Sequence, residues 1–278
     1  MELFEAVFNA NGIYDLMFFN IKAVLEYPNL KDLETNNPSL YKRWKYLSKS
    51  KYGFDMDVIH GVAGTLTDET PQYAQKTYEE KAVFYPEFTR IVAITYATLY
   101  PEKGETKRYF QKIVSEDEFF VINNFIEVLL QLSRNGAKSS PPYFPTFCGH
   151  NIINYDIPLL IKRFLKHIDE FKKILKPEET LKFPFILKRC LVAKPWESKV
   201  IDTVNVWKFN GNDYTPLMLI ADFLGLKKTV DLDVLPDVNK KYWRLVEVQP
   251  QEALEYVSLQ SATQTNFVIQ LMLKLREL

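Results

Sequence analysis

The sequence predicts an α/β protein in which a mixed central β-sheet is flanked by α-helices and followed by a long C-terminal helix. Short apolar runs typical of buried strands recur along the chain, and segments with apolar residues at helical spacing follow them. From about residue 250 to the end, one unbroken helical pattern remains. Strands that alternate with helices favour a single sheet with helices packed on its faces.

Three apolar segments are predicted strands. Residues 16–25 are short, apolar and rich in aromatic residues, and the period of two places Asn20 and Lys22 on the same face. Residues 88–100 and 106–114 are predicted to pair as a β-hairpin across a turn-rich connection.

The next segments alternate between helix and strand signals. Ser115 followed by Glu118 resembles a capping box, which predicts a helix start before an amphipathic run. Residues 144–153 then form an apolar strand that ends in a polar turn. This turn delivers Asp156 to the start of a helix, where Pro158 suits the first turn.

Composition limits the class of protein. A chain of 278 residues can hold one large domain, and we expect a single domain over residues 1–278 with a polar insertion at about 27–86. Lys and Arg number 35, as do Asp and Glu, so any nucleic-acid surface must be local.

Cys148 and Cys190 lack metal-ligand spacing, which favours two buried free thiols and a reducing compartment. The first residues resemble no signal peptide, and no uncharged run reaches the length of a membrane span. We therefore expect a cytoplasmic protein that does not bind a membrane.

The most informative segment is FCGHNIINYDIPLL, residues 147–160. Its Asp156 is expected just outside the carboxyl end of a strand, where α/β sheets bind ligands. The segment resembles the second sequence motif of the proofreading-type 3′→5′ exonucleases, in the tyrosine-type DEDD group of the ribonuclease H-like superfamily. Within that group it is most similar to the stand-alone proteins related to the exonuclease domain of family B DNA polymerases.

Other segments extend this resemblance over nearly the whole chain. Residues 16–22 resemble the first motif of the family, and residues 256–260, YVSLQ, resemble the third. Between the second and third motifs, residues 200–209 resemble a family strand, and a helix that starts near Thr215 and stops at Gly225 resembles the one that follows. The resemblance implies a ribonuclease H-like fold.

The resemblance also implies a set of active-site positions. The related exonucleases hold two divalent ions, Mg²⁺ or Mn²⁺, with four carboxylates. Carried over to this chain, the four positions are Asn20, Lys22, Asp156 and Gln260, so Asp156 is the single carboxylate. Four carboxylates carry four negative charges, whereas Asp156 and Lys22 together are neutral. We therefore expect no bound cofactor and an impaired or inactive site, with Asp202 as an alternative metal ligand.

Several side chains of the expected site have more than one interpretation. Tyr256 matches the family tyrosine that orients the attacking water, or it is a core tyrosine. His150 and Asn151 resemble the polar pair that approaches the substrate end, although a lone histidine is more often structural. Lys22 either takes the place of a metal and pairs with Asp156, or it points outward to solvent.

One basic and aromatic stretch lies in the insertion, at residues 41–52. Its Lys42, Arg43, Trp44 and Lys45 fit single-strand binding, in which cations contact the backbone and rings stack on bases. The alternative is an amphipathic helix with its aromatic residues in the core and its lysines in water.

Three functions follow as hypotheses. The first is a degenerate exonuclease domain that binds nucleic acid 3′ ends, most simply of single-stranded DNA, without hydrolysing them. The second is an active metal-dependent 3′→5′ exonuclease with relocated ligands. The third is a protein-interaction module that keeps only the fold. DNA, RNA and protein all stay open as partners, and so does the oligomeric state.

Overall fold

A computed structural model describes most of the chain. The described residues are 12–53, 70–136, 145–177, 179–180, 183, 200–209, 211 and 214–277. The chain forms two compact units: unit 1 contains Met1–Lys22, Ile91–Leu232 and Leu254–Leu278, and unit 2 contains Ala23–Arg90 and Asp233–Ala253. The single exonuclease-like domain over residues 1–278 stays a prediction, and the two units are described separately below.

The sheet has five strands in the order β3-β2-β1-β4-β5. Their bounds are β1 (Leu16–Leu25), β2 (Thr89–Glu102), β3 (Glu105–Val114), β4 (Thr146–Gly149) and β5 (Val200–Asp202). β4 runs parallel to β1 and to β5, whereas β2 and β3 are antiparallel. The predicted α/β fold with a mixed sheet is therefore confirmed.

β1 and the β2–β3 hairpin agree closely with the sequence. All ten residues of β1 are buried, as expected for an apolar strand covered on both faces. In the hairpin, Glu102 pairs with Glu105 across a turn of two residues, Lys103 and Gly104. Both have positive φ, of 51° and 83°, which is typical of the turn that matches the twist of paired strands.

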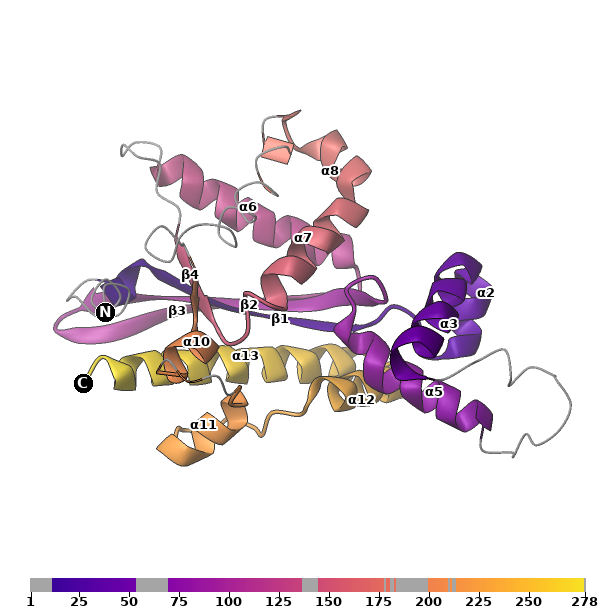
Figure 1. Ribbon diagram of the computed structural model, residues 1–278. Coiled ribbons are helices and arrows are strands. Elements are labelled where there is room, and N and C mark those ends of the chain that lie inside the picture. Colours follow the sequence, from indigo (N-terminus) through magenta and orange to yellow (C-terminus); the bar gives the residue numbers. More distant parts are fainter. Residues whose placement is uncertain are drawn as a thin grey trace, which may run out of the picture. The chain divides into compact units, whose positions relative to one another are not determined.

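Helices cover both faces of the sheet in unit 1. Their bounds are α6 (Glu118–Gly136), α7 (Asp156–Lys166), α8 (Ile168–Ile174), α10 (Thr203–Trp207), α11 (Leu217–Leu224) and α13 (Pro250–Leu275). α6, α7 and α8 lie on one face, and α10, α11 and α13 lie on the other (Figure 1). The long C-terminal helix, α13, is confirmed. Within the described part of the chain, no helix combines the length and the apolar composition that crossing a bilayer requires.

Two strands are shorter than predicted. The strand expected over residues 144–153 is limited to β4. Of residues 200–209, only β5 is extended, and α10 follows it directly. The reason lies in Asp202, whose carboxylate accepts a hydrogen bond from Val204 N at 3.0 Å and so caps the start of the helix.

The capping box predicted from Ser115 and Glu118 is wrong. The helix α6 begins after Asp117, whose Oδ1 accepts a hydrogen bond from Phe120 N at 3.2 Å. The Glu118 side chain is buried and bonds to other elements instead. A carboxylate at this position therefore serves tertiary contacts and not the local cap.

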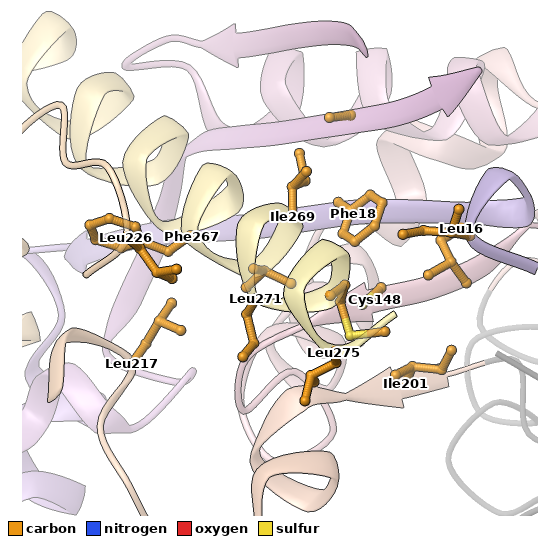
Figure 2. Close-up of a cluster of buried hydrophobic side chains, with 14 of the residues drawn as sticks. Leu16, Phe18, Cys148, Ile201, Leu217, Leu226, Phe267, Ile269, Leu271 and Leu275 are labelled. Atoms are coloured by element: carbon orange, nitrogen blue, oxygen red, sulfur yellow. The ribbon is translucent and has the colours of Figure 1, made fainter. Parts of the chain in front are cut away.

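An apolar cluster between the sheet and α13 forms one part of the core of unit 1 (Figure 2). β1 contributes Leu16 and Phe18, β4 contributes Cys148, and α13 contributes Phe267 and Leu271. Cys148 is a buried free thiol, as predicted, whereas Cys190 lies outside the described residues.

The period of two of β1 places polar residues next to this core. Asn20 and Lys22 continue the strand face that begins with Leu16 and Phe18. Both side chains are nevertheless buried. The apolar core therefore gives way, within one strand, to a buried polar region.

Unit 2 has its own aromatic core. Its helical elements are α2 (Leu30–Asn36), α3 (Pro38–Tyr52), α5 (Thr70–Lys81), η2 (Ala82–Phe84) and α12 (Leu235–Val248). The Trp44 ring lies at its centre, with ring centroids 5.4 Å from Phe88 and 5.5 Å from Tyr78. Where it is described, the insertion predicted at about 27–86 is thus largely helical.

Candidate functional site

Asp156 lies where the sequence predicted it, as the first residue of α7. Its side chain is only 2% exposed. Oδ1 accepts a hydrogen bond from Ile21 N at 2.6 Å and a longer one from Asn20 Nδ2 at 3.3 Å. These bonds connect the start of α7 to β1, so Asn20 and Asp156, two of the four positions predicted from the resemblance, are in direct contact.

The surroundings of Asp156 favour its protonated form. Burial is the main cause that raises the pKa of Asp156 to about 7, and the charge of the nearby Asp202 carboxylate acts in the same direction. The Ile21 N–H and the positive charge of Lys22 act in the opposite direction and lower this pKa. The protonated form of Asp156 is therefore populated near neutral pH, where an exposed aspartate is fully ionised.

Lys22 does not extend into solvent, so the interpretation in which it points outward is wrong. The side chain is 7% exposed, and Nζ donates a hydrogen bond to Gln264 Oε1 at 2.7 Å. The charge of its ammonium also acts on Asp156, where it opposes the effect of burial on the pKa of that carboxyl group. A cation is thus held in the polar region in which the family places carboxylates.

α13 contributes the remaining polar groups. Ser261 Oγ donates a hydrogen bond to Asn20 Oδ1 at 3.1 Å. Gln260, the last family position, is 3% exposed, and its Nε2 donates to the Asp231 carbonyl at 3.0 Å. Tyr256 precedes Gln260 by one helical turn and is half-buried. Its role in orienting water stays a prediction.

Asp202 holds the turn between β4 and α7. Oδ1 accepts hydrogen bonds from Asn151 N (2.8 Å) and Val204 N, and Oδ2 accepts one from Ile153 N (3.0 Å). Burial raises the pKa of Asp202, and these three N–H groups lower it. These three donors occupy most of the acceptor sites of the carboxylate, so the side chain is better suited to positioning the turn than to replacing a lost ligand.

The turn itself is sterically demanding. A Cβ on Gly149 would lie 2.3 Å from Ile152 Cγ2 and 2.8 Å from the Phe19 carbonyl oxygen, so only glycine fits. Asn151 has a φ of +63°, a left-handed conformation that asparagine tolerates. Close packing of this turn on β1 is what places Asp156 beside Asn20.

His150 is buried, with 4% of its surface exposed. Its Nδ1 lies 2.9 Å from Thr203 Oγ1, and that hydroxyl donates to the Gly149 carbonyl at 3.2 Å. Burial lowers the pKa of His150 to about 4, so the ring is neutral at pH 7. Of the predicted polar pair, His150 thus has the features of a structural histidine, and Asn151 is the partly exposed member.

The donors around Asp156 do not fit a two-metal centre. Such a centre needs several carboxylate oxygens, whereas the groups here are amides, a hydroxyl and an ammonium. Among the described residues, no group of three or more His, Cys, Asp or Glu side chains could hold a metal ion.

The basic stretch of the insertion forms α3, in unit 2. Trp44 is fully buried, so its prediction as a base-stacking residue is wrong. Lys42 and Arg43 are exposed, and Lys45 is half-buried over the Tyr41 ring. The amphipathic-helix interpretation is therefore confirmed for Tyr41 and Trp44, whereas Tyr46 is exposed.

Two polar residues of the site were missed in the sequence. Ser261 and Gln264 lie on α13, one and four residues after Gln260, and they bond to Asn20 and Lys22. The spacing of four would have placed Gln264 on the same helical face as Gln260. A polar residue such as Gln264 on the apolar face of a long helix would have indicated that this face contacts a buried polar region.

Comparison with known proteins leaves the family open. No protein-family model matches the chain, and neither does any curated protein or solved structure at a significant level. The strand order and the flanking helices are broadly consistent with a ribonuclease H-like topology.

Proposed function

We propose that this chain is an exonuclease-like protein that binds nucleic acid 3′ ends at the Asp156 site without hydrolysing them. By this proposal it descends from the tyrosine-type proofreading exonucleases and has a ribonuclease H-like fold. The observation that carries the proposal is that the one carboxyl group among the four positions, Asp156, is buried in the same polar region of β1 and α13 as a buried cation, Lys22, whose charge acts on it.

Charge supports binding over hydrolysis. Phosphodiester hydrolysis by the related exonucleases requires a strongly negative site that binds two divalent ions. Here Asp156 carries at most one negative charge, and Lys22 offsets it. The remaining groups, the amides of Asn20 and Gln260 and the Ser261 hydroxyl, are neutral hydrogen-bonding groups. Such a site no longer repels a phosphate group, and it lacks the carboxylates that would hold the metal ions needed to cleave a phosphodiester bond.

Binding to a labelled single-stranded oligonucleotide in EDTA tests the proposal. We expect a linear oligonucleotide with a free 3′ hydroxyl to bind more tightly than one whose 3′ end is closed into a circle. Asn151→Ala and Tyr256→Ala, at the two partly exposed positions, should each reduce this preference at least about fivefold. Asn124→Ala, on the exposed face of α6, is the matched control.

Hydrolysis is followed with the same oligonucleotide in Mg²⁺ or Mn²⁺. We expect no shortening by the wild-type protein, and a gain of shortening in the triple variant Asn20→Asp, Lys22→Glu, Gln260→Asp. Wild-type shortening that is lost in Asp156→Ala and in Asp202→Asn would instead establish an active enzyme with relocated ligands. Absence of any end preference would leave the protein-interaction module as the better hypothesis.

A further inference from the structure

The helix α3 of unit 2 has an unusual charge distribution. It contains five cationic residues and no acidic residue among its 15. The cationic residues are Lys42, Arg43, Lys45, Lys49 and Lys51. Because the whole chain has a formal net charge of zero, this helix is a local concentration of positive charge.

The two sides of α3 differ sharply. Tyr41, Trp44 and Ser48 are buried in the aromatic core of unit 2. The opposite side exposes Lys42, Arg43, Tyr46, Lys49 and Ser50. Tyr46 is 70% exposed, so an aromatic ring stands in water among the lysines.

We propose that Lys42, Arg43, Tyr46 and Lys49, the α3 basic face, bind single-stranded nucleic acid. The cations contact successive phosphates, and the Tyr46 ring stacks on an unpaired base. Helical spacing supports this arrangement, because Lys42 and Arg43 lie one turn before Tyr46 and Lys49 lies one turn after it. Lys42 and Lys49 are separated by about 10 Å along the helix axis, at about 1.5 Å per residue. The three cations distributed over that distance can contact up to three phosphates of one strand.

The exposed chemistry favours nucleic acid over a lipid surface. Helices that bind membranes insert an apolar face into the interface between headgroups and acyl chains. In α3 that face is occupied by the core of unit 2, through Tyr41 and Trp44. A single tyrosine with surrounding cations is the combination that single-strand binding proteins use.

This surface goes beyond the proposed end-binding site and is independent of it. Its contacts are with phosphates and a base along the strand, so they need no 3′ end. A circular single-stranded oligonucleotide has no end and therefore reports on the α3 basic face alone. If the wild-type protein does not prefer linear over circular oligonucleotides, the proposed function is overturned. If the wild-type protein does not bind the circular oligonucleotide, this inference is overturned.

The experiment measures the affinity of the full-length protein for a labelled circular oligonucleotide as a function of salt. With about three phosphate contacts, we expect log K to fall with log salt at a slope of about −2. The triple variant Lys42→Gln, Arg43→Gln, Lys49→Gln should bind at least about tenfold more weakly, with a slope near zero. Tyr46→Ala should weaken binding at least about fivefold and leave the slope unchanged.

Matched controls separate a specific surface from general charge. Lys166→Gln, Lys172→Gln, Lys173→Gln removes three exposed lysines from α7 and α8 in unit 1 and should leave the affinity unchanged. Lys42→Arg, Lys49→Arg should retain it. Wild-type affinity in the α3 triple variant, or an equal loss in the control triple, would contradict the proposal. Binding to phosphatidylserine vesicles without binding to the oligonucleotide would also contradict the proposal, and it would indicate that the α3 basic face binds membranes.

Discussion

Asp156 is a buried carboxyl group whose protonation depends on its surroundings. Burial and the Asp202 charge raise its pKa to about 7, and a hydrogen bond from Ile21 N keeps it in place. The unfolded chain would ionise the same group near pH 4. Asp156 therefore makes the free energy of unfolding depend on pH.

The Asp156→Asn variant tests this dependence. A carboxyl group with a raised pKa in the folded state contributes stability that is complete below about pH 4 and is lost as the pH rises to about 7. Asparagine stays neutral, so the free energy of unfolding of the variant, relative to wild type, should rise by a few kcal/mol over that interval and then level off. Urea unfolding between pH 4 and pH 8.5 measures it.

Asp169→Asn serves as the control, because Asp169 is an exposed aspartate on α8. Its stability profile should remain parallel to that of the wild type. Parallel profiles for Asp156→Asn as well would contradict the raised pKa of Asp156.

At the level of elements, Glu118 joins α6 to β2 and α7. Its Oε1 accepts hydrogen bonds from Ile91 N (2.6 Å) and Arg163 Nε (2.8 Å), and its Oε2 accepts from Arg163 Nη2 and lies 2.9 Å from His167 Nε2. Breaking one partner of a buried ion pair leaves an uncompensated charge, which is strongly destabilising. α7 is thus held at both ends, by Asp156 and by the Arg163–Glu118 pair.

His167 makes the contact at the far end of α7 sensitive to pH. The hydrogen bond with Glu118 is the main cause that raises the pKa of His167, and Glu170 on α8 raises it further. The stabilisation is complete below the pKa of about 6.5 that His167 has in the unfolded chain. It is lost as the pH rises through the raised pKa of His167 in the folded protein. The substitution His167→Gln should lower the free energy of unfolding by about 1 kcal/mol at pH 5.5, after allowance for solvent screening. The decrease should be smaller at pH 9.

Chemical unfolding at both pH values, together with an NMR titration of His167, checks this expectation. Glu170→Gln removes the exposed partner and should have a smaller effect. A cost of His167→Gln that grows from pH 5.5 to pH 9 would be inconsistent with a raised pKa.

At the scale of the whole molecule, the chain has two compact units with separate cores. Trp44 is the centre of the core of unit 2, and Trp44→Ala should lower the free energy of unfolding by about 3–5 kcal/mol. Hydrogen exchange should increase in α2, α3 and α5, whose side chains form this core. Tyr46→Ala, on the exposed side of the same helix, should change stability by less than about 0.5 kcal/mol. Equal effects of the two variants would contradict the assigned faces of α3.

Elements with a clear local pattern were predictable. β1, the β2–β3 hairpin and α13 follow from hydrophobic periodicity, which depends on residues close in the sequence. Other features could not be predicted because a side chain has a distant partner. Asp202 bonds to Asn151, 51 residues away, and Glu118 bonds to Arg163, 45 residues away. No local pattern contains such a contact.

The same division holds for the candidate site. Local sequence was enough to place Asp156 at the start of a helix and to put Asn20 and Lys22 on one strand face. Folding decided that Asp156 favours protonation, that Lys22 bonds to Gln264 and that Trp44 is buried while Tyr46 is exposed. Desolvation, charge and hydrogen-bond partners depend on every element packed around a group, and only the tertiary structure brings those elements together.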